Sequence, residues 1–190
     1  MKKTSVYLIL SLLLCFQSLS AQTSWSLFWR TDSVQVNKIE AFDNKQYRKV
    51  GHHGPAVENS FMALRIYFNN SGAIDVYSKR GPAMELRKYL WYPSEKQQKE
   101  ENAGCDEYFV GKTVGLGGIK LWDGENEVAV AIGSKRVANA GDTAEGSFAE
   151  VITYGVPYKE CTSCKCISKP YSYWRRHVVR GRIIRRGSNA

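Results

Sequence analysis

The residues best suited to chemistry lie in one short run, Gly51 to Glu58, which reads Gly-His-His-Gly-Pro-Ala-Val-Glu. The chain has only three histidines, and two of them, His52 and His53, stand side by side in this run. Histidine is the side chain whose ordinary pKa lies closest to neutrality, so it can accept or donate a proton under physiological conditions. The neighbouring glycines and proline set the backbone geometry, which predicts that both imidazoles sit on a turn.

Three interpretations of this turn remain open. His52 and His53 could be metal ligands, but a third ligand would have to be Glu58 or Asp106, and the spacing selects neither. They could be turn histidines whose hydrogen bonds serve only the local structure. They could also act as a general base or contact a substrate, and the residues that follow in the sequence favour this role over a metal site.

A β-hairpin is predicted directly after the histidine turn. Residues 62–68 and 74–77 alternate between apolar and polar side chains, and the intervening Asn-Asn-Ser-Gly is a turn whose glycine can take a positive φ. Because a one-residue slip would exchange the two faces, only one register matches them. That register pairs Ile66 with Ile74, Leu64 with Val76, and Arg65 with Asp75.

The polar face of this hairpin supplies the rest of a possible reaction centre. Arg65 opposite Asp75 is more typical of a cross-strand ion pair than of a ligand clamp. Tyr67 and Tyr77 share the same face and are the candidate proton donors.

Further candidate substrate contacts lie later in the chain. Lys112 is an alternative to Arg65 as the partner of a substrate carboxylate, and Trp91 and Trp122 are candidate platforms for sugar stacking, with core packing as the alternative for both. Two glycine-rich segments are rejected as nucleotide motifs. Asp106 stands where a phosphate loop ending at Lys112 needs glycine, and Lys120 stands where a dinucleotide fingerprint needs its third glycine. We predict no cofactor and no metal site.

The elements that must position these side chains are short strands separated by turn signals. Besides the hairpin, strands are predicted at 33–42, 119–122, 127–132 and 148–154, and a capping-box pattern that begins at Ser94 predicts one short surface helix. This organisation predicts an all-β, antiparallel β-sandwich. The strand count is low for a closed sandwich, which indicates an incomplete fragment of a larger one.

The amino terminus predicts export. Residues 1–21 have a positive start, a short apolar stretch and small residues at a cleavage point, which together are typical of a signal peptide. The apolar stretch is shorter than the 20 or so residues of a membrane span, so we expect no stable span after cleavage and a periplasmic or secreted protein. Cys15 follows Leu14, which is larger than a lipidation motif usually allows, so lipidation is disfavoured.

The formal charge of +9 is misleading about partners. Ten of the 27 basic residues lie in the predicted signal or after Glu160, and all 18 acidic residues lie between, so residues 22–160 carry 17 basic and 18 acidic side chains. A basic domain would favour nucleic acid. This near-neutral domain with a basic tail does not, and we predict no nucleic-acid partner.

The tail at 161–190 differs in character from the domain at 22–160. Its Cys-x-x-Cys-x-Cys run and the later histidine could form a zinc site, and ordinary disulfides or a basic binding tail are alternatives. A frame change is favoured over these. Each cysteine codon is TG-pyrimidine and is followed here by a codon that begins with A, so a one-base shift would encode valine or alanine. The residues concerned in the zinc interpretation are Cys161, Cys164, Cys166 and His177.

Several blocks of the sequence resemble domain-of-unknown-function family 4861. They are Gly51-His-His-Gly-Pro-Ala-Val-Glu-Asn59, Ala73-Ile-Asp-Val-Tyr-Ser-Lys79, Trp91-Tyr-Pro93, the glycine-rich Gly111–Gly118, Leu121-Trp-Asp-Gly124 and Gly155-Val-Pro-Tyr158. The resemblance implies an exported bacterial protein associated with degradation of polysaccharides that contain uronic acids. It also implies that this chain carries only the amino-terminal half of the family's domain, and it supplies no catalytic residues.

The sequence and the resemblance together predict a protein that acts on acidic oligosaccharide or polysaccharide by elimination, as a lyase or dehydratase does. His52 or His53 would be the base, Tyr67 or Tyr77 the proton donor, and Arg65 or Lys112 the partner of the carboxylate. One alternative is a non-catalytic carbohydrate-binding β-sandwich, with exposed aromatic side chains and histidines bonded to the backbone. Another is a truncated product without activity.

Overall fold

The computed structural model describes residues 22–90, 93–106, 108, 111, 113, 115–116 and 119–158, and the backbone of four later strands. Nearly all regular structure in these residues is antiparallel β-sheet, as the alternating sequence predicts. No helix in the described part is long and apolar enough to cross a membrane.

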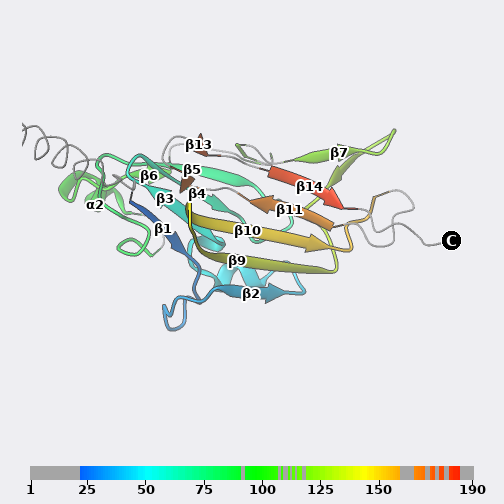
Figure 1. Ribbon diagram of the computed structural model, residues 1–190, viewed down its shortest axis with the longest axis horizontal. Coiled ribbons are helices and arrows are strands. Elements are labelled where there is room, and N and C mark those ends of the chain that lie inside the picture. The colour runs from blue at the N-terminus through cyan, green and yellow to red at the C-terminus, as the bar shows by residue number, and fades with distance from the viewer. Residues whose placement is uncertain are drawn as a thin grey trace, which may run out of the picture.

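Two five-stranded sheets form the body of the molecule (Figure 1). The first sheet has the order β1-β3-β4-β5-β6, and the second has the order β14-β11-β10-β9-β2. The first contains β1 (Thr23–Ser26), β3 (Ala56–Asn59), β4 (Met62–Ile66), β5 (Ile74–Ser78) and β6 (Cys105–Asp106). The second contains β2 (Lys38–Ala41), β9 (Lys135–Thr143), β10 (Gly146–Tyr154), β11 (Lys165–Lys169) and β14 (Arg180–Ile184).

Smaller elements complete the described fold. Two hairpins pair β7 (Lys120–Trp122) with β8 (Glu127–Ala129), and β12 (Ser172–Tyr173) with β13 (Arg176–His177). The helices are the short 3-10 segments η1 (Gln46–Lys49) and η2 (Gly51–His53), and the α-helix α2 (Glu95–Glu100).

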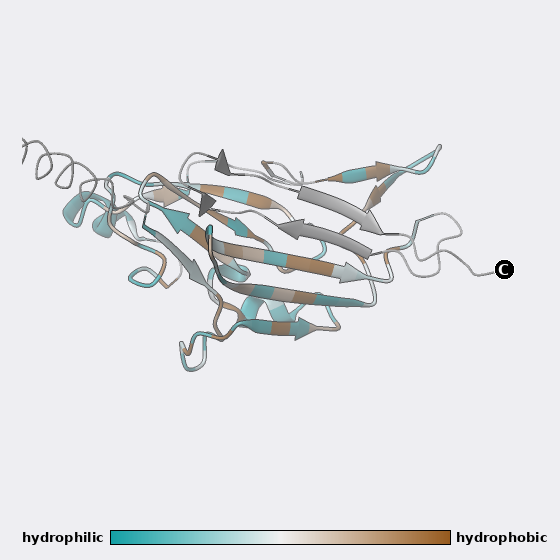
Figure 2. Cartoon of the chain, in the orientation of Figure 1, coloured by the Kyte–Doolittle hydropathy of each residue, from teal (hydrophilic) through white to brown (hydrophobic). Residues whose placement is uncertain are grey.

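The hydrophobic core lies between the two sheets, which makes the fold a β-sandwich. Strand β10 alternates between buried and half-buried residues along most of its length, and both β9 and β10 carry hydrophilic and hydrophobic residues (Figure 2). One buried cluster joins side chains of both sheets, so removal of their apolar surface from water holds the sheets together. The cluster includes Leu64, Ile66 and Ile74 of the first sheet and Ala138, Ala140 and Val151 of the second.

The predicted hairpin is confirmed in its register. Strands β4 and β5 pair Ile66 with Ile74, Leu64 with Val76 and Arg65 with Asp75. Gly72 in the connecting turn has a φ of 54°, which glycine adopts without steric cost. The apolar face of the hairpin points into the sandwich core, so its polar face points away from that core.

Four of the other predicted elements are confirmed with changes of length. The capping box at Ser94 begins α2, where the Ser94 hydroxyl accepts a hydrogen bond from the Gln97 amide and the Gln97 side chain accepts one from the Ser94 amide. The predicted strands at 119–122 and 127–132 form the β7–β8 hairpin, and the strand at 148–154 is most of β10.

The predicted strand at 33–42 is only partly correct. Regular pairing covers β2 alone, because Asp32 accepts a hydrogen bond from the Val34 amide and Ser33 has a φ of 57°, so the chain turns there.

Strands β3 and β9 were not expected from the sequence. All four residues of β3 are buried, so they lack the alternation of a half-exposed strand. Strand β9 is rich in alanine, asparagine and glycine, which have low strand propensity.

The backbone of β11 and β14 extends the second sheet beyond β10 into the basic tail. The proposed zinc ligands Cys161, Cys164, Cys166 and His177 have side chains that lie outside the described part of the structure. The frame-change interpretation concerns the gene, and it stays a prediction.

Candidate functional site

The Gly-His-His-Gly run forms the 3-10 turn η2 against the end of the hairpin, which confirms that the two histidines sit on a turn. His52 and His53 have φ values of 53° and 59°, which are unusual for residues with a side chain. A Cβ atom at Gly51 would overlap the Phe28 ring, and one at Gly54 would overlap the carbonyl of Ile66. The backbone therefore approaches its neighbours on both sides of the histidine pair.

His52 faces the interior. It is 3 % exposed, its Nε2 lies 3.0 Å from the carbonyl oxygen of Leu86, and its ring meets Phe28 edge-on at 5.6 Å between centroids. Because a carbonyl can only accept, Nε2 carries the proton and donates it. This nitrogen of His52 thus holds a loop in place.

His53 faces the polar side of the hairpin and is half-buried. Its ring stacks on Tyr67, with 5.7 Å between centroids and 23° between planes, and lies 5.2 Å from the ring of Tyr47. Burial lowers the pKa of His53 to about 4, and the positive charges of Arg65, Arg30 and Arg48 add to this effect. At neutral pH the imidazole is therefore uncharged and able to accept a proton.

Arg65 is committed to acidic side chains of its own chain. Its Nε and Nη2 donate to Asp75 Oδ2 at 3.1 and 2.6 Å, and Nη2 also donates to Asp106 Oδ2 at 2.7 Å. Arg65 is 7 % exposed, so the expected cross-strand pair with Asp75 is present and buried. Nη2 also donates to the Tyr67 hydroxyl at 3.2 Å, which connects Arg65 to the His53 stack. Desolvation raises the pKa of the Asp106 carboxyl.

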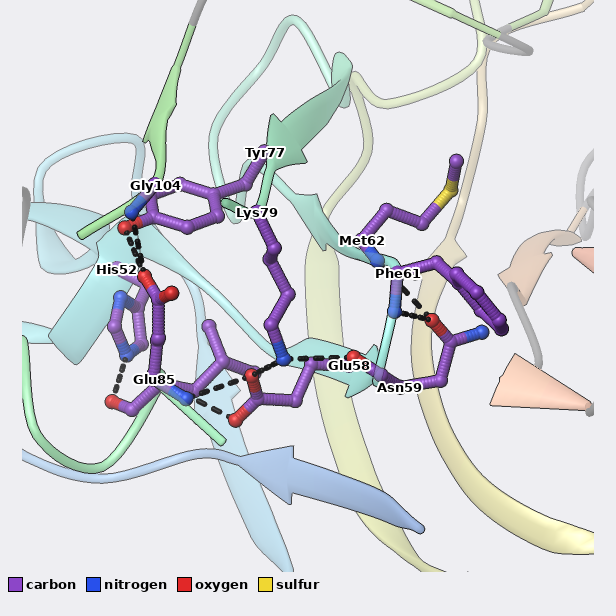
Figure 3. A network of polar contacts seen from close by, with 10 residues as sticks. His52, Glu58, Asn59, Phe61, Met62, Tyr77, Lys79, Glu85 and Gly104 are labelled. Atoms are coloured by element: carbon purple, nitrogen blue, oxygen red, sulfur yellow. Dashed lines mark hydrogen bonds and ion pairs between the residues drawn. The ribbon is translucent and has the colours of Figure 1, made fainter. Parts of the chain in front are cut away.

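A second cluster on the same sheet face is centred on Glu58 (Figure 3). Its carboxylate accepts hydrogen bonds from the backbone amides of Leu86 at 2.9 Å and Glu85 at 2.8 Å. It also pairs with Lys79 Nζ at 2.8 Å, and both side chains are fully buried. Glu58 is the last residue of the histidine run, and here it fastens the loop that follows β5 onto β3.

Tyr77 belongs to this second cluster. Its hydroxyl donates to Glu85 Oε2 at 2.9 Å, and the same carboxylate oxygen accepts a hydrogen bond from the Gly104 amide at 2.9 Å. Burial, followed by the Glu85 carboxylate, raises the pKa of Tyr77 far above its ordinary value. The hydroxyl therefore keeps its proton and anchors the loop.

A small cavity lies between the two clusters, and four polar residues line it. Its volume is about 20 Å³, which is room for roughly one water molecule and not for a sugar ring. The polar residues that line it are His52, Arg65, Tyr77 and Glu85.

Two exposed arginines beside His53 could not be selected from the sequence. Arg30 Nη1 donates to the carbonyl oxygen of Arg48 at 3.3 Å, and the Arg48 guanidinium lies 5.9 Å from the centre of the Tyr47 ring. Arg30 is 23 positions before His53 in the chain, and nothing in its local pattern marks it as a site residue. Arg48 stands close to the histidine run, which is the only sequence signal for either residue.

The remaining candidates lie elsewhere. Trp122 is 60 % exposed on β7, and its hairpin packs through Leu121 in a separate cluster with Val130 and Val156. Trp91 and Lys112 lie outside the described residues. Of the sequence-derived set, the structure brings His53, Tyr67, Arg65 and Asp75 together, and it places His52 and Tyr77 beside the buried loop.

Comparison with curated proteins and with solved structures found no match. A family model does match the chain, over residues 17–156, which includes the histidine turn, the hairpin and both clusters described above. The chain therefore belongs to the family described as Domain of unknown function (DUF4861).

Proposed function

We propose that this protein acts on carbohydrate that contains uronic acid, outside the cytoplasm, and that it does so by elimination. The observation that carries the proposal is the stack of His53 on Tyr67, with Arg65 Nη2 donating to the Tyr67 hydroxyl. This arrangement puts an uncharged imidazole beside a phenol whose conjugate base would be stabilised by a guanidinium. Elimination requires a base that reaches the C–H bond and an acid that reaches the departing oxygen, and His53 and Tyr67 can take these two roles.

The reaction assigns one role to each side chain. The imidazole of His53 takes the proton from the sugar carbon that bears the carboxyl group. The electron pair of that C–H bond forms a carbon–carbon double bond, and the C–O bond at the next carbon breaks. Tyr67 gives its proton to the departing oxygen, and Arg65 stabilises the phenolate until a proton returns from the imidazolium. The sequence left two candidates for each of the base and the acid, and the contacts support His53 and Tyr67.

The test compares two tyrosine variants of the full chain. Wild-type protein is incubated with uronate oligosaccharides, and the new double bond is followed by ultraviolet absorbance. Tyr67→Phe and His53→Gln are each expected to lower kcat/KM by at least about a hundredfold, the usual contribution of a general acid or base. Tyr77→Phe is the matched control and should retain most of the activity. Wild-type rates in both active-site variants, or no product from wild type on any uronate, would overturn the proposal.

A second candidate is a non-catalytic carbohydrate-binding sandwich. It is supported by the Nε2 of His52, which bonds to a backbone carbonyl, and by Arg65, which already pairs with two carboxylates. The exposed ring of Trp122 is also typical of such proteins. Calorimetry separates the two candidates, because a binding module would hold uronate oligosaccharides tightly and release them unchanged.

A further inference from the structure

The surface next to His53 is built from two segments that a backbone bridge holds together. Trp29 and Val50 form an isolated antiparallel bridge, and the amide of Arg30 donates to the carbonyl of Lys49 at 2.8 Å. The Arg30 side chain then reaches back to the carbonyl of Arg48 at 3.3 Å. These contacts hold the Arg30 side chain against the backbone of η1, and Arg30 and Arg48 are both exposed to solvent.

Tyr47 connects these arginines to the histidine. Its ring lies 5.9 Å from the guanidinium of Arg48 and 5.2 Å from the ring of His53. The Tyr47 ring also packs against the main hydrophobic core, so its position is set by the sandwich itself. Arg48, Tyr47, His53 and Tyr67 thus form a continuous row from solvent to the reacting groups.

We propose that Arg30, Arg48 and Tyr47 form a carboxylate-binding subsite that holds an acidic sugar against His53. A guanidinium presents a planar fork of donors that matches a carboxylate, and the face of a tyrosine ring accepts the C–H surface of a sugar. Arg65 is poorly placed for this contact, because it is 7 % exposed and its Nε and Nη2 already donate to Asp75 and Asp106. The identity of the ligand as a uronate rests on the proposed function.

The subsite has an electrostatic consequence for His53. The charges of Arg30 and Arg48 help to depress the pKa of this imidazole, which makes it a weak base in the free protein. A bound carboxylate would offset those charges and raise the pKa towards the ordinary histidine value. The base would therefore gain strength when the acidic sugar is in place, and a neutral sugar would leave it weak.

Calorimetry with the full chain tests the binding step. The probes are tetrasaccharides of galacturonic, glucuronic and mannuronic acid, each beside its methyl ester, which has the same shape without the charge. Wild type is expected to prefer the acid form of at least one tetrasaccharide, with an affinity that falls as salt rises. Arg30→Gln and Arg48→Gln should each weaken that affinity roughly tenfold, as loss of a charged hydrogen bond does. The control, Lys96→Gln with Lys99→Gln, removes two equally exposed charges from α2 and should bind as wild type does.

Nuclear magnetic resonance of His53 supplies a reading that general loss of structure would not produce. Saturation with the acid tetrasaccharide should raise the pKa of His53 from about 4, and the methyl ester should leave it unchanged. In the double variant Arg30→Gln with Arg48→Gln the pKa of the free protein should already be higher and should respond little to the ligand. Equal affinity for acid and ester, wild-type affinity in the double variant, or no binding of any probe would overturn the subsite.

Two outcomes separate this inference from the proposed function. If wild type binds the acid tetrasaccharide through both arginines but releases no unsaturated product, the subsite stands and elimination is wrong. If wild type forms product and the two arginine variants keep its KM, elimination stands and the subsite is wrong.

Discussion

Two tyrosines on the same face of the first sheet have opposite surroundings. The Tyr77 hydroxyl donates to Glu85 inside a cluster that also contains the fully buried pair of Glu58 and Lys79. The Tyr67 hydroxyl accepts from Arg65 beside His53, where the surface opens towards exposed arginines. Strand alternation alone treats the two tyrosines as equivalent.

The difference comes from what covers each tyrosine. The chain that leaves β5 folds back over β3, and its amides at Glu85 and Leu86 use both oxygens of the Glu58 carboxylate. Polar groups in that cluster therefore bind each other and have little capacity left for a ligand. Tyr67 is half-buried as Tyr77 is, but its neighbour His53 lies beside Tyr47 and the exposed Arg48, so a ligand can approach from this side. The neighbours of each side chain, more than its residue type, separate a structural cluster from a candidate site.

The largest expected effect is on the Glu58 cluster. Glu58→Gln leaves Lys79 as a buried charge without its carboxylate and should lower the free energy of unfolding by about 3–5 kcal/mol. Urea denaturation measures this change. Glu100→Gln on α2 is the control, and its exposed side chain predicts almost no effect. A Glu58→Gln protein as stable as the control would remove the basis for calling this cluster structural.

The two tyrosines themselves give the next largest effect. Tyr77→Phe removes a hydrogen bond to a charged group and should cost about 1.5–3 kcal/mol of stability. Tyr67→Phe leaves Arg65 with both carboxylates and should cost less than about 1 kcal/mol, while it abolishes turnover of uronates. Urea denaturation and the absorbance assay, run on both variants, give the two readings. Similar losses of stability and activity in both would mean that the two clusters do not differ in role.

A smaller effect concerns pH. Because the folded pKa of His53 lies below that of an unfolded histidine, its contribution to stability is complete above about pH 6.5 and falls as pH drops towards 4. Wild type should therefore lose more stability than His53→Gln between pH 7.5 and pH 4.5. Urea denaturation of both proteins at the two pH values checks the sign. Parallel losses would show that the His53 environment in the folded protein does not disfavour its charge.

The smallest effect is expected at Trp122. Its side chain is 60 % exposed, so Trp122→Ala should leave the urea midpoint almost unchanged. If this ring stacks on sugar, the variant should bind oligosaccharide a few-fold more weakly, since one aromatic contact contributes about 0.5–1.5 kcal/mol. Calorimetry measures the change, with Phe61→Ala as a similarly exposed aromatic control. Equal affinities in the Trp122 variant and wild type would remove this residue from the binding surface.

The sequence predicted those parts of the fold that depend on local rules. The hairpin of β4 and β5 follows from alternation and a glycine turn, and α2 follows from its capping box. Strand β3 escaped prediction because residues buried on both faces show no alternation. Such a strand is defined by partners distant in the chain, which no local window contains.

The site was predictable to the same limited degree. The histidine turn and the polar face of the hairpin could be predicted from local sequence. The residues that they contact could not, because those contacts join segments that are distant in the chain. The sequence offered Arg65 as a possible partner of a substrate carboxylate. In the structure Asp106 of β6 is a second acidic partner of Arg65, which the sequence did not predict. The sequence did not distinguish His52 from His53. In the structure His52 contacts the Leu86 carbonyl, whereas His53 stacks on Tyr67.

The glycines at 51 and 54 give a criterion for recognising relatives that share this site. The Phe28 ring occupies the space where a Cβ of residue 51 would lie, and the Ile66 carbonyl does the same for residue 54. A related protein that keeps both histidines but has a larger residue at either position must hold its turn farther from the Phe28 ring or from the hairpin. Its imidazoles would then no longer align with the tyrosine row. The glycine spacing, more than the histidine pair, therefore identifies proteins in which the same arrangement can form.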